Sequence, residues 1–143
     1  MTTFDPGSIP KYCVIGLPHR FQEGDYAQRK LFVVLGHRKG YALCLKATSR
    51  VEMYRNNKDA MAGVVYYRGG EITAFPEDTA IQADNCVPIP HGELSEAKAN
   101  GRLEIREVLP EDFENRLRRA VDNSVTLDNL KRKRLCDLLG FTT

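Results

Sequence analysis

Arg29 and the Thr48-Ser49 pair are the residues whose types and spacing best suit chemistry on a phosphate. They flank two apolar runs, 30–36 and 41–47, that have the β-branched and aromatic character of strands. The polar link 37–40 ends in Gly and has the length of a hairpin turn. Because the first strand of an antiparallel hairpin begins where the second one ends, Arg29 is expected beside both hydroxyls.

A guanidinium next to two hydroxyls is able to hold a phosphate, because its planar donors match the phosphate oxygens. The alternative is that Arg29 is a solvated charge at the edge of a strand. In that case Thr48 and Ser49 would do no more than terminate a strand, where polar residues are common. The spacing alone leaves both interpretations open.

The candidate residues lie in the most basic part of the chain. Residues 29–58 hold eight Lys or Arg and a single acid, which is a net charge of +7, whereas residues 59–104 have a net charge of −5. Such an asymmetry favours an anionic ligand at one face, and nucleic acid is the commonest one. We therefore predict that nucleic acid is contacted by Lys30, Lys46, Arg50 and Arg55, together with His19 on the preceding loop. Alternatively, the basic and acidic segments pair with each other across the fold.

The whole sequence has the composition of one globular domain, residues 1–143. It is 42% hydrophobic and 28% charged, and it has no apolar run of the roughly 20 residues that cross a membrane. Its start lacks a basic region followed by an apolar segment, so we expect no secretory signal and a cytoplasmic location. The four cysteines and three histidines are scattered without a metal-binding spacing, so no metal and no cofactor is predicted.

The pattern of the remaining chain indicates short strands first and helices late. Strands are expected at 11–17, 30–36, 41–47, 63–68, 71–75, 79–83 and 102–109, and helices at 92–100, 111–122 and 127–139. Residues 50–62 are expected to be irregular, and 86–89 to form an edge or a loop because of two prolines. Ser124 or Thr126 is the expected cap of the last helix, which carries a stripe of leucines. This order argues for a small twisted barrel or half-barrel of the α+β class.

The ordered set of motifs resembles the MazF/PemK family of toxin endoribonucleases over residues 9–121. The motifs are Leu17-Pro18 at the end of the first strand, Arg29 before an apolar strand, and Thr48-Ser49 at the end of the next. Later motifs are Asp78 with Ile81, and Gly101-Arg102-Leu103 before a helix. The sequence departs from the family at Lys30, where members have Pro, and at 9–11, where they have Gly-Asp. Residues 122–143 form a C-terminal helical extension.

The resemblance implies an SH3-like barrel of the MazF/PemK/CcdB type, a homodimer, and a partner antitoxin. It implies metal-independent cleavage of single-stranded RNA, with Arg29 and Thr48 as catalytic residues and Ser49 as a further donor. In this interpretation the RNA's own 2′-hydroxyl attacks the phosphorus, and the protein positions groups and stabilises charge.

A proton shuttle, where one is needed, is expected from His19 on the covering loop 18–28 rather than from His37, which lies at the turn. One alternative is a catalytically inactive barrel that binds nucleic acid or a protein. Another is an interaction role for the leucine-striped helix 127–139.

Overall fold

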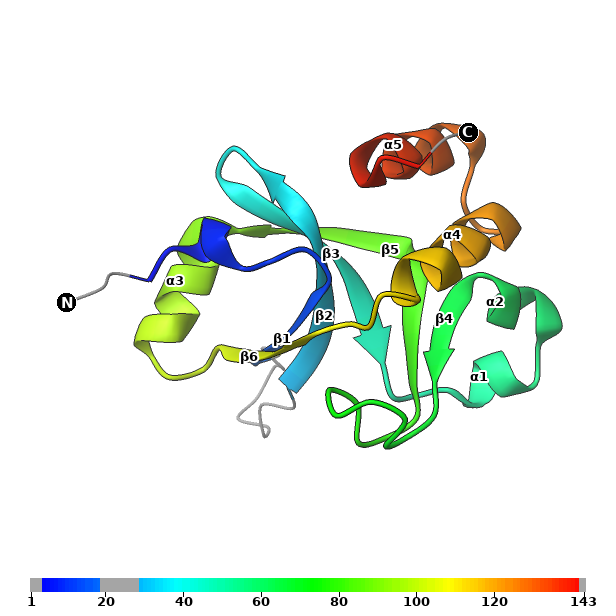
Figure 1. Cartoon of the computed structure of the whole chain (residues 1–143), viewed down its shortest axis with the longest axis horizontal. Helices are drawn as coiled ribbons and strands as arrows, with labels where there is room; N and C mark the ends of the chain where they lie inside the picture. Colours follow the sequence, from blue (N-terminus) through cyan, green and yellow to red (C-terminus); the bar gives the residue numbers. More distant parts are fainter. Residues whose placement is uncertain (1–3, 19–28, 142–143) are drawn as a thin grey trace, which may run out of the picture.

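A curled antiparallel sheet forms the centre of the molecule (Figure 1). The computed structural model describes residues 4–18 and 29–141. Its strands are β1 (Cys13–Pro18), β2 (Arg29–Arg38), β3 (Tyr41–Thr48), β4 (Val64–Tyr67), β5 (Thr79–Pro90) and β6 (Glu104–Val108). They form one six-stranded sheet in the order β4-β5-β3-β2-β1-β6. The sheet curls into a half-barrel accompanied by helices, so the predicted α+β class is confirmed.

The hairpin predicted from the sequence is β2 and β3, but its turn is tighter than expected. His37 pairs with Ala42 and Arg38 with Tyr41, so the link is not four residues long. Only Lys39 and Gly40 remain in the turn, and Gly40 takes a φ of 88°, which glycine adopts without strain. His37 and Arg38 therefore belong to β2, because their backbones continue the pairing with β3.

Both faces of the sheet are buried, and alternation along the strands decides which residues belong to each face. Val14, Val33 and Leu45 belong to a large core, which also contains the apolar face of α4 (Phe113–Asn123). Ile15 and Val34, their neighbours in sequence, belong to a second core that includes Leu94 of α3 (His91–Ala99). Near-continuous apolar runs such as 31–35 are what a strand covered on both sides requires.

The predicted strand 71–75 is wrong, because this segment is a loop. Its backbone is bound elsewhere: the Ala74 N–H donates to Glu107 Oε1 at 2.6 Å, and Gly70 N–H donates to Phe75 O at 2.9 Å. Phe75 is fully buried against the ring of Tyr67, with the ring centroids 5.7 Å apart. The alternating pattern therefore reflects burial of a loop, and β4 pairs with β5 instead.

The predicted short strand 79–83 is in fact the beginning of the long strand β5, which also includes 86–89. Pro88 and Pro90 are tolerated because β4 reaches only as far as Gln82, so this half of β5 pairs on one side alone.

The prediction that residues 50–62 are irregular is wrong. This segment forms two short helices, α1 (Glu52–Arg55) and α2 (Lys58–Ala62).

The last helix, α5 (Asn129–Leu139), begins two residues later than predicted. Asp128 caps it by accepting from the Lys131 N–H at 2.8 Å, and Gly140 ends it with a φ of 74°. Ser124 instead follows α4 and accepts from the Leu127 N–H at 3.3 Å. The predicted leucine stripe is wrong at Leu130, whose side chain is 58% exposed.

Arg132, in the basic run of α5, has a structural role. Its guanidinium donates to the carbonyls of Val121 at 3.0 Å, Ser124 at 2.8 Å and Leu127 at 3.3 Å. These carbonyls lie at the end of α4 and in the link to α5. Since carbonyls at the end of a helix lack partners within it, one cation both caps α4 and fixes α5 beside it.

Candidate nucleic-acid site

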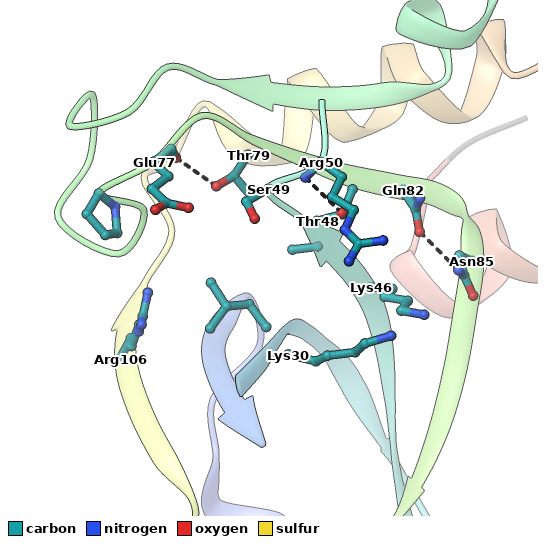
Figure 2. Close-up of a pocket in the computed structure, with 13 residues that line it drawn as sticks. Lys30, Lys46, Thr48, Ser49, Arg50, Glu77, Thr79, Gln82, Asn85 and Arg106 are labelled. Carbon is teal, nitrogen blue, oxygen red and sulfur yellow. Dashed lines mark hydrogen bonds between the residues drawn. The ribbon is translucent and has the colours of Figure 1, made fainter. Parts of the chain in front are cut away.

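A pocket of about 580 Å³ lies at the open end of the β2–β3 hairpin, far from its turn (Figure 2). It is formed by the ends of β2 and β3, the start of β5, the loop before β5, and β6. Its lining residues are Lys30, Leu31, Lys46, Ala47, Thr48, Ser49, Arg50, Pro76, Glu77, Thr79, Gln82, Asn85 and Arg106. The structure thus brings five of the predicted site residues together: Lys30, Lys46, Thr48, Ser49 and Arg50.

The register of the hairpin explains why these residues meet. Phe32 pairs with Lys46 and Leu31 with Ala47. Continuing the same register by one residue sets Lys30 opposite Thr48. Opposite residues in an antiparallel pair point to the same face, and so do residues two apart along a strand. Lys30, Lys46 and Thr48 therefore share one face of the sheet.

Three cations converge in the pocket. The Lys46 side chain lies within hydrogen-bonding reach of Lys30 and lowers the pKa of the Lys30 ammonium below its usual value, with loss of hydration and the charge of Arg50 acting in the same direction. None of the three cations forms an ion pair with an acid within residues 4–18 and 29–141. Like charges held together without an acid form a site that gains most from a bound anion.

Two hydroxyls lie beside these cations. Thr48 Oγ1 accepts from the Arg50 N–H at 3.1 Å, which fixes the turn after β3. This bond uses a lone pair of the oxygen and leaves the hydroxyl hydrogen free to be donated to a ligand. Ser49 is exposed on the same rim. The arrangement matches a phosphate, whose oxygens accept from both ammonium and hydroxyl groups.

The opposite wall of the pocket carries charges of both signs. Arg106 Nε donates to Glu104 Oε1 at 2.9 Å, and its guanidinium also contacts the Ala74 carbonyl. Its charge is therefore shared with an acid, whereas Lys30 has no ion pair with an acid among the described residues. Glu77 lines this wall as well, and its backbone carbonyl accepts from the Thr79 hydroxyl at 2.8 Å.

Arg55 has its own partners and is not among the residues that line the pocket. Its guanidinium contacts Asp78 and donates to Tyr66 Oη at 3.3 Å. Asp78 also accepts from the Gly69 N–H at 2.6 Å and from Tyr66 Oη at 2.9 Å. The Gly69 bond first, and then those of Tyr66 and Arg55, hold the pKa of the Asp78 carboxyl below its usual value. Asp78 therefore organises the loop between β4 and β5.

The remaining predicted site residues have different outcomes. The backbone of Arg29 opens β2 opposite Pro18, and the catalytic role of its side chain stays a prediction. His19 and the covering loop lie outside the described residues. His37 lies at the other end of β2, where its Nδ1 is 2.9 Å from His91 Nε2 and its Nε2 is 2.8 Å from the Ile9 carbonyl. The His37 ring thus links the hairpin tip to the N-terminal segment and α3.

Sequence reasoning missed the residues that β5, the loop before it and β6 contribute to the pocket, namely Pro76, Glu77, Thr79, Gln82, Asn85 and Arg106. Gln82, Asp84 and Asn85 form a polar interruption between the apolar parts of this strand, which is a weak local indication of function. A grouping of three or more His, Cys, Asp or Glu side chains that could hold a metal ion is not found in the described residues. In the same part of the chain, every helix is too short or too polar to cross a membrane.

The fold and the pocket together define a curled α+β half-barrel with a cationic site at the open end of its central hairpin. A solved structure shares this fold: a chain in the crystal structure of MazE-MazF (Form-II) from Deinococcus radiodurans. It matches with a TM-score of 0.52 and 18% identity, over 94% of this chain and 98% of that chain. No family model and no curated protein matches the sequence. At this identity the likeness shows the fold, which agrees with the predicted MazF-like barrel.

Proposed function

We propose that this protein is a metal-independent endoribonuclease toxin of a type II toxin-antitoxin system that cleaves single-stranded RNA. The observation that carries the proposal is the pocket in which Lys30, Lys46 and Arg50 lie beside the hydroxyls of Thr48 and Ser49. The fold shared with a chain of a MazE-MazF complex supports the same function. An antitoxin partner, a homodimer and a cytoplasmic location belong to the proposal.

In the proposed reaction the scissile phosphate occupies the cationic face of the pocket. The 2′-hydroxyl of the RNA attacks the phosphorus, the bond to the 5′-oxygen breaks, and the products are a 2′,3′-cyclic phosphate and a free 5′-hydroxyl. The 2′-hydroxyl loses its proton and the leaving oxygen gains one, so the reaction consumes no other reactant. Arg29 and the pocket cations stabilise the extra negative charge of the pentavalent phosphorus, and Thr48 donates its free hydrogen to a phosphate oxygen.

The experiment incubates the purified chain with end-labelled single-stranded RNA in EDTA. We expect cleavage to products that end in a cyclic phosphate. Arg29→Ala is expected to slow cleavage by about 10²-fold or more, which is typical for loss of one group that stabilises the transition state. Thr48→Val removes the hydroxyl with little change of shape and is expected to slow it by about tenfold or more.

Matched controls come from exposed residues that do not line the pocket, namely Arg119→Ala and Thr73→Val. Both should cleave at the rate of the original chain. If the original chain leaves RNA intact, the enzyme function is wrong. If Arg29→Ala cleaves as fast as the original chain, the catalytic role of Arg29 is wrong. RNA binding that weakens with salt but leads to no cleavage would instead support a barrel that only binds nucleic acid.

A further inference from the structure

The start of β5 contains a large bulge directly beside the cationic pocket. Leu45 pairs with Cys86, and Ala47 pairs with Ile81, so Lys46 alone stands opposite residues 82–85. Bulges next to functional sites often serve to redirect side chains. Here the bulge brings Gln82 and Asn85 into the lining of the pocket, on the side that carries Lys46 (Figure 2).

The bulge is fixed in place by contacts to the rest of the fold. Ala83 is buried in the large core, and its N–H donates to the Gly63 carbonyl at 3.3 Å. Asp84 Oδ2 accepts from the Thr126 hydroxyl at 2.5 Å, which ties the bulge to the link between α4 and α5. Ala83 and Asp84, in the middle of the bulge, therefore anchor it, while Gln82 and Asn85 at its two ends line the pocket.

The pocket amides form an oriented chain that starts from a buried tyrosine. Gln82 Nε2 donates to Tyr54 Oη at 2.6 Å, and Tyr54 is only 6% exposed. The Gln82 carbonyl oxygen must then point the other way, where it accepts from Asn85 Nδ2 at 3.0 Å. Asn85 keeps its own carbonyl oxygen and a second N–H hydrogen for a ligand. In the described part of the chain neither of these has a partner.

A free amide carbonyl beside a free N–H is a group that reads the edge of a base. Asparagine pairs best with the Hoogsteen edge of adenine, where the N6 amine donates and the ring N7 accepts, a pair that cytosine, which lacks N7, does not present on that edge. Unpaired bases of single-stranded RNA expose the edges that such a group needs. We propose that Asn85, oriented by Gln82, binds a base next to the phosphate in the pocket and selects adenine there. This inference rests on the proposed RNA-binding function.

The test measures base preference by binding, so that it does not depend on cleavage. A randomised pool of short single-stranded RNAs with 2′-fluoro sugars, which lack the attacking hydroxyl, is bound to the protein, and the bound fraction is sequenced. The original chain should enrich adenine at one position by about fivefold or more. Asn85→Ala should lose that enrichment.

Asn85→Asp is the sharper variant because it keeps the shape of the side chain. A carboxylate only accepts, so at that position it should favour guanine, which has two neighbouring N–H donors on its Watson–Crick edge. The added negative charge weakens binding of every RNA, but a preference is a ratio between bases within one variant and is unaffected. Asn123→Asp adds the same charge at an exposed residue outside the pocket and should keep the adenine preference.

The outcomes separate this inference from the endoribonuclease function. Cleavage of ordinary RNA together with an unchanged base preference in Asn85→Asp overturns the role of Asn85 and leaves the enzyme standing. A shift to guanine without any cleavage supports Asn85 and removes the enzyme. A pool that the original chain binds without preference, or does not bind, overturns the inference about Asn85, and cleavage of ordinary RNA then decides the enzyme function separately. Thermal unfolding of each variant confirms that it is folded.

Discussion

Replacing Lys46 by glutamine is expected to stabilise the free protein, although it removes a charge from the surface. The Lys46 side chain lies within hydrogen-bonding reach of Lys30, and Arg50 adds a third positive charge. Two unit charges at ~4 Å repel by about 1 kcal/mol in water and by about 4 kcal/mol at an effective dielectric constant of ~20. Both lysines are partly exposed, so the lower value applies. We expect Lys46→Gln to raise the free energy of unfolding by about 0.5–1 kcal/mol at low salt.

Urea unfolding at two salt concentrations measures this effect. The gain should be present at about 0.01 M salt, where the screening length is ~30 Å, and should disappear near 1 M, where it is ~3 Å. Lys133→Gln removes an exposed lysine of α5 outside the pocket and serves as the control. A Lys46→Gln protein that is less stable than the original chain at low salt would refute the repulsion, because it would mean that an attractive partner holds Lys46.

The pH dependence gives an independent check on the same cluster. The pKa of Lys30 is lower in the folded chain than its ordinary value, chiefly because of Lys46. Between the folded pKa and the unfolded value of about 10.4, the unfolded chain binds more protons, so stability rises with pH in that window. As the pH rises to about 10, the free energy of unfolding of the original chain should therefore increase relative to that of Lys46→Gln. Inorganic phosphate should raise the melting temperature of the original chain more than that of the variant.

Two further predictions concern groups that support the site from outside. Asp78→Asn should lower the melting temperature at neutral pH, because the carboxylate accepts from the Gly69 N–H and its pKa is depressed. That stabilisation is lost as the pH falls through the depressed folded pKa of Asp78, so the difference in melting temperature between the two proteins should shrink as the solution is acidified below the usual carboxyl pKa. Arg132→Ala should lower the free energy of unfolding by about 1.5–3 kcal/mol, since the cation binds three carbonyls around Ser124. Urea unfolding against the exposed neighbour Lys133→Ala checks this, and equal losses would remove the capping role.

Local pattern was enough to predict the parts of the fold that depend on neighbours in sequence. The runs 30–36 and 41–47 became β2 and β3, and the apolar stripe of the helix at 111–122 is buried as α4. The failures have long-range causes. The segment 71–75 alternates like a strand, but it is a loop whose Phe75 packs in the core and whose backbone binds Glu107 from β6. An alternating pattern reports burial, and it does not report which hydrogen bonds the backbone makes.

In the candidate site, too, some residues are placed by local sequence and others by long-range contacts. The sequence could place Thr48 and Ser49 beside the start of the other strand, where Arg29 was expected, because a hairpin brings the ends of its strands together. That Lys30 and Lys46 share a face with Thr48 follows from the observed register. The amide of Asn85 could not be placed, since its position depends on a bulge that is visible only in the pairing of β5 with β3. That bulge in turn depends on contacts to the link between α4 and α5 and to Gly63 before β4, which no local pattern contains.

The pocket changes how Lys30 is interpreted. It stands where the resembling family has proline, and on sequence alone this departure kept open the alternative of a catalytically inactive barrel. In the structure Lys30 is one of the three cations of the pocket, so the substitution adds charge at the place where a phosphate would bind. In the proposed reaction this cation would stabilise the charge of the phosphorus together with Arg29, so lysine in place of proline is compatible with the proposed catalysis.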